Sequence, residues 1–279
     1  MPLVTLAYAL AIAEKKNIAI GAFNIGNYES LKAVIDCASE LELPVIIQIF
    51  NRLFNDNKAR DLSALVKGMA ENENIPIVLH LDHGRNMTQV EKAVQYGFTS
   101  VMIDGSDLPI DENIKLTKEV VTLARKHNVS VEAELGRLLP KESIDSVSFL
   151  TLPEEAKAFA ERTSVDALAV AIGTSHGFYK EAPFIDLERL KTIRSLVKIP
   201  LVLHGGSCTP DEDVKKSISY GIRKINIATE FHQAYIDGIA TQAELHKGKF
   251  SPIDIYNLPV YERMKELVRK KIAFFASGS

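Results

Sequence analysis

The stretch IPIVLHLDHG, residues 75–84, decides the fold because it joins an apolar run to three titratable side chains. Its first five residues form the continuous apolar run expected of a strand that is covered on both faces. The run then ends in His80, Asp82 and His83. In a parallel α/β barrel the loops after the strands build the active site, so titratable groups at this point indicate chemistry at one rim.

This run is one of eight, and segments with helical spacing lie between them, for example at residues 28–41, 110–127 and 183–197. Buried strands that alternate with helices imply a parallel sheet, and eight such units close into an α/β fold, the (β/α)8 TIM barrel. A doubly wound sheet is the competing fold, although no glycine-rich dinucleotide loop follows the first run. The runs are IAIGAF (18–23), VIIQIF (45–50), IPIVLHLD (75–82), SVMID (100–104), VSVEAEL (129–135), ALAVAIG (167–173), IPLVLHG (199–205) and IRKINIA (222–228).

Two further segments predict helices outside the eight units. Near the N-terminus, Leu3, Leu6, Leu10 and Ala13 fall near helical spacing. This segment has no basic start and its lysines follow the apolar part, unlike a secretory leader. The apolar pattern of residues 261–275 predicts an extra C-terminal helix.

Length and composition limit the kinds of partner. A chain of 279 residues with 46% hydrophobic and 25% charged residues suits one barrel domain over residues 1–279. The net charge of −3 is spread along the chain, so we expect neither nucleic acid nor a membrane as partner. Cys37 and Cys208 are too few for a disulfide framework or a cysteine zinc site, which suits a reducing cytoplasm.

Three histidines, His83, His176 and His204, fall at the ends of separate strands. Neutral imidazoles suit zinc, and three protein ligands with an open fourth position describe a catalytic metal site. One histidine at a strand end is more often a hydrogen-bonded loop residue, but three at one rim are harder to ascribe to chance. His80 either supports such a ligand or is simply packed. The remaining histidines lie in helical stretches and are expected to be surface or packing residues: His127, His232 and His246.

Glycine-rich loops after late strands give a second signal. They are SHGFYK (175–180), HGGS (204–207) and NIATE (226–230). Small residues let backbone amides approach an anion, and such loops are a common phosphate site in barrels. The alternative is that the glycines only make tight turns. Because Lys180, Ser207 and Thr229 accompany them, a phosphate cradle is the better interpretation.

Six motifs occur in one order along nearly the whole chain. They are GAFN (21–24), DHG (82–84), EAELG (132–136), GTSHG (173–177), HGGS (204–207) and KINIATE (224–230). Together they resemble the class II, zinc-dependent fructose-bisphosphate and tagatose-bisphosphate aldolase family, and most closely its shorter, tagatose-type branch. The resemblance implies a lyase that cleaves a ketose 1-phosphate reversibly to dihydroxyacetone phosphate and an aldehyde.

The resemblance also implies roles for the polar residues at the rim. His83, His176 and His204 would bind Zn2+, and Asp82 would exchange the proton on the hydroxyl group of the bond that is broken or made. The chemistry agrees, because cleavage next to a carbonyl leaves an enediolate whose charge a cation stabilises. By the same resemblance, Glu134 would be a nearby or alternate zinc ligand, or a ligand at a second metal site. Glu132 would lie in the outer shell. Asp104 would lie in the outer shell or at the second site.

One acid of the family lies on the loop after the fifth strand and handles the carbon-bound proton of the dihydroxyacetone phosphate half. Glu142 keeps the family's spacing from Glu134. The family usually has two glycines where this chain has Leu139 and Pro140, and proline restricts the backbone there. Loop closure is therefore expected to differ, and a plain surface glutamate is the alternative.

The resemblance assigns the C1 phosphate and the substrate to residues in the late loops. Cys208 stands where members often have glycine, and a positive φ there would cost roughly 1 kcal/mol or more. A monovalent cation, Na+ or K+, is implied near the phosphate by the family alone. The contact residues would be Asn24, Gly177, Lys180, Gly205, Gly206, Ser207, Asn226, Ala228 and Thr229.

The sequence departs from the family pattern at two positions that would meet the far end of the substrate. Bisphosphate-specific members have a serine where this chain has Phe50, and an arginine, often reaching a neighbouring subunit, where it has Ile253. Without that arginine a distal phosphate loses charge-assisted hydrogen bonds worth roughly 1.5–3 kcal/mol each. We therefore expect a ketose 1-phosphate whose far end is neutral or carries another anion. Arg52 and Arg85 would receive a carboxylate or sulfonate, or else they are solvated loop residues.

Two other functions stay open at this point. One is a non-catalytic aldolase-like subunit that supports a partner enzyme, against which the retained Asp82, Glu142 and histidines argue. The other is a zinc hydrolase, in which the metal activates water. The extra carboxylate and lysine bridges of two-metal barrels are not evident, which weakens that interpretation. The family and the apolar C-terminal helix predict a homodimer or homotetramer.

Overall fold

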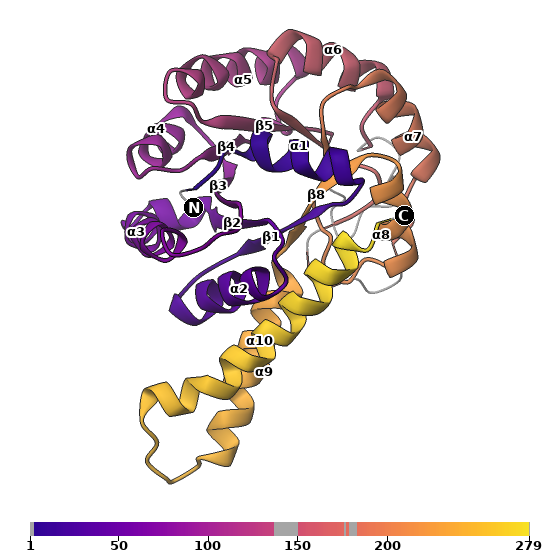
Figure 1. Ribbon diagram of the computed structural model, residues 1–279. Helices are drawn as coiled ribbons and strands as arrows, with labels where there is room; N and C mark the ends of the chain where they lie inside the picture. The colour runs from indigo at the N-terminus through magenta and orange to yellow at the C-terminus, as the bar shows by residue number, and fades with distance from the viewer. Residues whose placement is uncertain (1–2, 137–149, 176, 179–182, 279) are drawn as a thin grey trace.

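Eight parallel strands form a closed barrel in chain order, as the ribbon diagram of the computed structural model shows (Figure 1). The structure describes residues 3–136, 150–175, 177–178 and 183–278. Each strand pairs with the next, and β8 pairs with β1, so the predicted (β/α)8 TIM barrel is confirmed. The strands are β1 (Ile20–Asn24), β2 (Val45–Phe50), β3 (Ile77–Gly84), β4 (Ser100–Ile103), β5 (Ser130–Leu135), β6 (Ala167–Val170), β7 (Leu201–Leu203) and β8 (Ile222–Ile227).

Helices follow the strands and cover the outside of the barrel. Several begin at a side chain that caps the first turn: Asn27 accepts from the Ser30 amide before α2, and Asn86 accepts from the Gln89 amide before α4. These helices are α2 (Tyr28–Glu40), α3 (Lys58–Ala70), α4 (Met87–Gln95), α5 (Ile110–Arg125), α6 (Pro153–Thr163), α7 (Leu187–Leu196) and α8 (Asp211–Ser219), with the short 3-10 helix η1 (Asn51–Phe54) after β2. None of the helices within the described ranges is long and apolar enough to cross a membrane.

Helix α1 (Leu6–Lys16) confirms the predicted N-terminal helix and lies across the amino end of the barrel (Figure 1). Its buried residues Leu6 and Leu10 pack on Ile46, Val78 and Val202 from the strands. This apolar plug closes one end of the barrel interior. The interior therefore opens at the other end, where the strands finish.

Helices α9 (Thr229–Leu245) and α10 (Ile253–Ala276) form a hairpin that projects from the barrel (Figure 1). The C-terminal part of α10 returns to the barrel, where the Phe275 carbonyl accepts a hydrogen bond from the Ala19 amide. The predicted C-terminal helix is thus confirmed, and it begins earlier than the pattern of residues 261–275 indicates. The far end of the hairpin stands away from the strand ends.

Two runs continue two or more residues beyond the carboxyl end of the strand that they form. The runs at 167–173 and 199–205 end as strands at Val170 and Leu203. The residues beyond turn away from the barrel through Gly173 and Gly205, whose φ angles of 115° and 66° favour glycine. The polar residues that follow these strands therefore sit on loops over the open end.

Candidate active site

A cavity of about 240 Å³ opens at the carboxyl ends of the strands. Its walls come from loops and strand ends that are far apart in sequence, as expected for the catalytic face of a parallel barrel. Every one of its lining residues except His232 was singled out from the sequence. They are Asn24, Phe50, Arg52, Asp82, His83, Gly177, Gly205, Ser207, Asn226, Ala228, Thr229 and His232.

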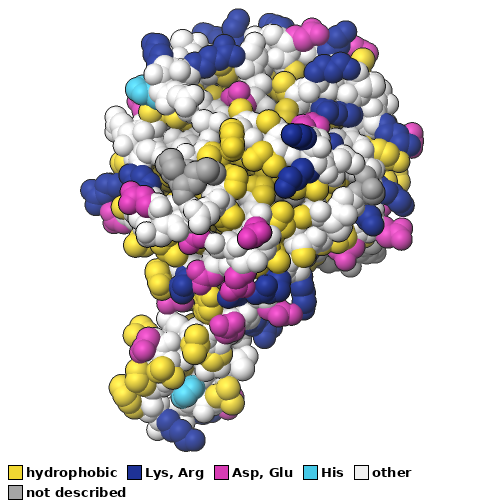
Figure 2. Space-filling model, in the orientation of Figure 1, with side chains coloured by type: hydrophobic (Ala, Val, Ile, Leu, Met, Phe, Trp, Pro, Cys, Tyr) yellow, Lys and Arg dark blue, Asp and Glu magenta, His cyan; other side chains and the backbone are white. Residues whose placement is uncertain are grey.

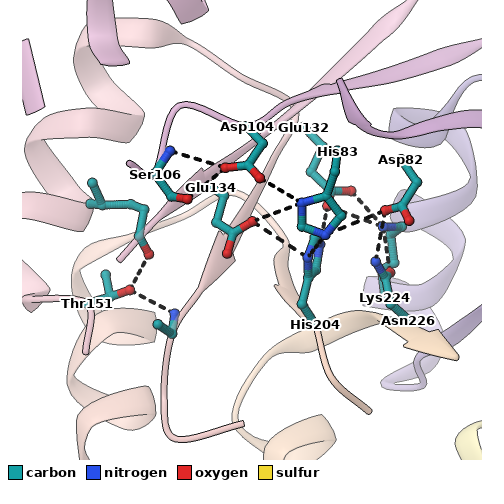
Figure 3. A network of polar contacts seen from close by, with 12 residues as sticks. Asp82, His83, Asp104, Ser106, Glu132, Glu134, Thr151, His204, Lys224 and Asn226 are labelled. Carbon is teal, nitrogen blue, oxygen red and sulfur yellow. Dashed lines mark hydrogen bonds and ion pairs between the residues drawn. The ribbon is translucent and has the colours of Figure 1, made fainter. Parts of the chain in front are cut away.

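A bulge at the end of β3 turns Asp82 and His83 into the same cavity. Successive residues of a regular strand point to opposite faces. Here the pairing of β3 with β4 shifts register between Leu81 and Gly84, and His83 has a left-handed φ of 50°. Gly84 permits this close approach, because a Cβ there would lie 2.6 Å from the Met102 carbonyl oxygen. The bulge therefore places a carboxylate and an imidazole from neighbouring residues side by side (Figure 3).

Carboxylates fix the orientation of His83 and His204. His83 Nδ1 lies 2.8 Å from Asp104 Oδ2, and His204 Nε2 lies 2.9 Å from Glu132 Oε1. When each of these nitrogens donates to its carboxylate, the lone pairs of His83 Nε2 and His204 Nδ1 turn toward one another, 3.1 Å apart. Carboxylate partners of this kind orient metal-binding histidines.

Glu134 completes a group that fits a metal ion. Its Oε2 lies 3.7 Å from His204 Nδ1, and it is a buried oxygen without a hydrogen-bond partner among the described residues. Ligand atoms of His83, Glu134 and His204 all lie within 4.8 Å of one another. Two imidazole nitrogens and a carboxylate oxygen are donors that zinc accepts. The orphaned oxygen and the converging nitrogens therefore fit the metal that the sequence predicts.

The charges of the site favour a cation as well. Burial alone lowers the pKa of His83, but the carboxylates of Asp82, Asp104 and Glu134 outweigh it and raise this pKa to about 9. Burial raises the pKa of Glu134 to about 8. Burial works in the same direction on Asp104, yet the bond from His83 holds its pKa well below the ordinary value. Acidic groups thus crowd around the two imidazoles, and a dication would neutralise them.

Two amide side chains hold the Asp82 carboxylate. Asn24 Nδ2 lies 2.7 Å from Asp82 Oδ2, and Asn226 Nδ2 lies 3.4 Å from Oδ1. Asn24 is itself held by Gln48, whose Nε2 donates to Asn24 Oδ1 over 3.0 Å. The Asp82 side chain therefore has one orientation, facing the cavity beside His83.

Residues predicted to form a phosphate cradle, among them Gly205, Ser207 and Thr229, line the same cavity. Helix α9 begins there without a side-chain cap, so its first amides are available to an anion. Ser207 Oγ accepts from the Ala228 amide at 3.2 Å, which joins two of the loops. Gly177, with φ of 97°, and Gly205 line the wall beside them. In Gly205 a Cβ would lie 2.5 Å from the Ser175 carbonyl oxygen, so tight packing also requires this glycine.

Three predicted residues lie elsewhere. The Gly206 amide donates to the Asn226 carbonyl at 3.2 Å, so it serves packing rather than a phosphate. Arg85 is engaged by Asp104 at 3.2 Å and does not line the cavity. Ile253 begins α10 at the far end of the hairpin, 76% exposed, so it does not reach the cavity of its own chain. None of the three lines the cavity of this chain, and their roles in substrate binding stay predictions, because sequence position does not record where a backbone amide or a loop side chain finds its partner.

Three other predicted residues, Glu142, His176 and Lys180, lie outside the described residues, as do Leu139 and Pro140. Cys208 does adopt the left-handed conformation that its position suggested, with φ of 59°.

The sequence reasoning missed three residues near the cavity. His232 was expected to be a surface or packing residue, yet it lines the cavity, and its Nε2 donates to the Asn24 carbonyl at 2.8 Å. Its spacing of three from Thr229 in a helix was the available signal. Gln48 and Lys224 are polar residues inside apolar runs and are both fully buried. That contrast with their neighbours was their signal.

Comparison with known proteins agrees with this geometry. The family model described as fructose-bisphosphate aldolase class-II matches residues 4–279. The structure of the YdjI aldolase from Escherichia coli K12 is 37% identical, with a TM-score of 0.88, over 99% of this chain and 98% of that one. A Coccidioides immitis protein provisionally described as a fructose-1,6-biphosphate aldolase is 29% identical, with a TM-score of 0.85, over 97% and 95% of the two chains. The fructose-bisphosphate aldolase of Campylobacter jejuni shares the fold at 23% identity, with a TM-score of 0.83 over 98% and 95%.

Proposed function

Because the chain belongs to the class II fructose-bisphosphate aldolase family, we propose that it is a zinc-dependent enzyme that cleaves a ketose 1-phosphate reversibly to dihydroxyacetone phosphate and an aldehyde. The observation that carries this proposal is the bulge of β3, which turns Asp82 and His83 into one cavity. A proton-transfer group beside a metal ligand is the arrangement that aldol cleavage needs.

The metal would be held by His83, His204 and His176, with Glu134 as a nearby or alternate ligand. When bound, zinc supplies a Lewis acid that polarises the ketose carbonyl, an effect worth several kcal/mol of transition-state stabilisation. Asp104 and Glu132 hold the imidazoles of His83 and His204 in the orientation that this requires.

Asp82 moves the proton on oxygen. In the cleavage direction its carboxylate takes the proton from the hydroxyl group on the carbon that becomes the aldehyde. The adjacent carbon–carbon bond breaks, and its electron pair passes to the other half as an enediolate. Glu142 would then give a proton to the carbon of that half, which completes dihydroxyacetone phosphate.

The C1 phosphate would lie on the wall formed by Gly177, Gly205 and Ser207, at the start of α9. The uncapped amides of this helix attract an anion, and the Thr229 hydroxyl would add a donor. By the resemblance to the family, Lys180, which lies outside the described residues, would add another. The phosphate anchors the ketose so that the bond to be broken lies beside Asp82. A monovalent cation near this phosphate is part of the proposal on family grounds alone.

The far end of the substrate would meet Phe50 and Arg52. The Arg52 guanidinium lies 5.0 Å from the centre of the Phe50 ring, and it forms no ion pair with a described residue. An arginine next to an aromatic ring can still present its donors to a planar anion. We therefore propose that the substrate ends in a carboxylate or sulfonate rather than in a second phosphate.

A cleavage screen tests the proposal. Zinc-loaded protein is given ketose 1-phosphates that end in a hydroxyl, a carboxylate or a phosphate, and dihydroxyacetone phosphate is detected by a coupled NADH assay. We expect release to be fastest from the acid-ended substrates and to fall by roughly 10²–10⁴-fold in Asp82→Asn, which keeps the shape of the side chain. A chelator should abolish release, and added zinc should restore it.

Two outcomes of the screen would contradict the proposal in different ways. Fast turnover of a 1,6-bisphosphate with a micromolar Michaelis constant would overturn the assignment of the far end only. No release from any ketose phosphate by zinc-loaded protein would overturn the activity and return the chain to a non-catalytic supporting subunit.

The assembly is proposed to be a homodimer or homotetramer. The tip of the α9–α10 hairpin, which we define as Leu245, Phe250, Ile253, Ile255 and Leu258, exposes apolar side chains (Figure 2). Phe250 is 91% exposed, and a group of such residues on a projecting hairpin is costly to leave in water. Light scattering on Phe250→Glu should show a smaller assembly than the unsubstituted protein.

Three remaining assignments belong to the same proposal. The chain is taken as one catalytic domain over residues 1–279, within the shorter, tagatose-type branch of the family. Its location is taken to be the cytoplasm, where thiols stay reduced, because Cys37 and Cys208 are both free thiols.

A further inference from the structure

Lys224 lies at the centre of the barrel interior, with no exposed surface, and the ketose cleavage outlined above gives it no task. Its Nζ lies 2.9 Å and 3.2 Å from the two oxygens of Glu132 and 2.7 Å from Asn226 Oδ1 (Figure 3). A buried ammonium group is costly unless it is paired. These contacts satisfy the charge, and they also join Asn226, which holds Asp82, to Glu132, which holds His204.

The contact of Lys224 with Asn226 decides which way the Asn226 amide faces. A lysine ammonium group can only donate, so the Asn226 atom that meets it must be the carbonyl oxygen. The amide nitrogen then faces the other way, toward Asp82 Oδ1. Without Lys224 the amide can turn over and present its oxygen to a carboxylate, which is repulsive.

The contact of Lys224 with Glu132 holds the carboxylate that accepts a hydrogen bond from His204. Glu132 Oε1 accepts from His204 Nε2 and also lies within hydrogen-bond distance of Lys224. Glu132 and Lys224 come from β5 and β8, which are not neighbours in the barrel. Their ion pair therefore crosses the interior and fixes the position of the acceptor that orients His204.

We propose that Lys224 is a positioning residue that couples the proton-transferring Asp82, through Asn226, to the metal-binding His204, through Glu132. Among the described residues, its side-chain contacts are with Glu132 and Asn226, so it would act through these two residues. The coupling of Lys224 to Asp82 rests on the proposed function, because it is tested by kcat. The coupling to His204 through Glu132 is tested by zinc affinity and does not depend on the activity.

Gln48 provides a matched control for Lys224. It is equally buried in the barrel interior, and it holds Asn24, the other amide on Asp82. Among the described residues, its side chain forms no hydrogen bond or ion pair with Glu132 or His204. A variant of Gln48 therefore disturbs one amide of Asp82 and leaves the histidine side intact.

The test compares two double-mutant cycles with this control. The first cycle combines Lys224→Met with Asn226→Ala and measures kcat and KM at saturating zinc. The second combines Lys224→Met with Glu132→Gln and measures zinc affinity by competition with a chromogenic chelator. Gln48→Met is measured in both assays, and circular dichroism with thermal unfolding checks that each variant is folded.

We expect Lys224→Met to lower kcat by about 10–100-fold with KM nearly unchanged, and to weaken zinc binding by at least about 10-fold. In the Asn226→Ala background its cost in kcat should shrink to about 2-fold, and in the Glu132→Gln background its cost in zinc affinity should shrink likewise. Gln48→Met should lower kcat without weakening zinc binding. If the fold-losses of the two single variants multiply without reduction in the double variant, in both cycles, the proposal is overturned. A loss of zinc affinity in Gln48→Met equal to that in Lys224→Met would also overturn it.

Two further measurements keep the test decisive. If Lys224→Met does not fold because Glu132 is left as an unpaired buried charge, the double variant Lys224→Met with Glu132→Gln removes both charges. Its zinc affinity should then equal that of Glu132→Gln, and its kcat should fall to that of Asn226→Ala; a higher kcat refutes the coupling. If the unsubstituted protein cleaves no ketose phosphate, the proposed function fails, and the zinc cycle still decides the Glu132 side.

Discussion

Replacing Asp104 by asparagine should weaken zinc binding although the side chain keeps its shape. Asp104 Oδ2 accepts from His83 Nδ1 at 2.8 Å and lies 3.2 Å from Arg85. Its Oδ1 accepts from the Ser106 amide at 3.2 Å and from the Ser106 hydroxyl at 2.7 Å. Both oxygens of the buried carboxylate are therefore acceptors for donors on opposite sides.

An asparagine has one oxygen and must place its NH2 group on one of these sides. Toward Ser106 the NH2 group meets a backbone amide, which cannot accept a hydrogen bond. Toward His83 it forces the imidazole to place its proton on Nε2, the nitrogen that faces His204. Loss of such a partner costs about 10–100-fold in metal affinity, which is about 1.4–2.7 kcal/mol.

Competition with a chromogenic zinc chelator at fixed pH measures this change, and Asp107→Asn is the control. Asp107 also contacts Arg85, at 3.6 Å, and its side chain is 71% exposed. The control removes the same charge from the same loop without touching His83. We expect it to stay within about 2-fold of the unsubstituted protein, since exposed ion pairs contribute little. Equal losses in Asp104→Asn and Asp107→Asn would refute the tautomer argument, because charge alone would then explain the effect.

Three other predictions follow from single observations. In metal-free protein, burial lowers the pKa of His83 but its carboxylate neighbours raise it to about 9, so the folded state keeps a proton that the unfolded chain loses near pH 6.5. The free energy of unfolding without zinc, measured in urea, should therefore fall as pH rises from about 6.5 to 9, and a flat profile would contradict the pairing. Cys208→Gly should raise the free energy of unfolding by up to about 1 kcal/mol because φ is 59°, whereas an equal gain in Cys208→Ala would exclude backbone strain as the cause. Arg52→Leu should raise KM by about 10-fold or more for an acid-ended ketose phosphate and leave KM for a hydroxyl-ended one within about 2-fold; equal changes for both would remove Arg52 from the recognition of the far end.

Much of the fold could be predicted because its signals are local. The eight runs form eight strands, since burial on both faces leaves continuous apolar stretches in the chain. Strand ends were less predictable, as the early ends at Val170 and Leu203 show. Glycines with positive φ redirect the chain there, and an apolar residue after the turn looks the same in sequence as one before it.

The candidate site also contains residues that could be predicted from local position and residues that could not. The presence of Asp82, His83 and His204 at one rim follows from barrel topology, since all strands of a parallel barrel end on the same side. The position of Arg85 could not be read from the sequence, because its ion pair with Asp104 joins the segments that follow β3 and β4. His232 was overlooked because a helical histidine shows nothing of the cavity that its helix adjoins.

By itself, then, the sequence determined the barrel and the set of residues at its open end, because apolar periodicity and position along a strand are local properties. Only the tertiary structure decided how those residues cooperate. The bulge that turns both Asp82 and His83 inward depends on a register shift against β4. The ion pair of Lys224 with Glu132 depends on closing the barrel around them. Contacts between residues 92 positions apart, as in this pair, arise from the geometry of the closed sheet, and no local pattern in the chain encodes them.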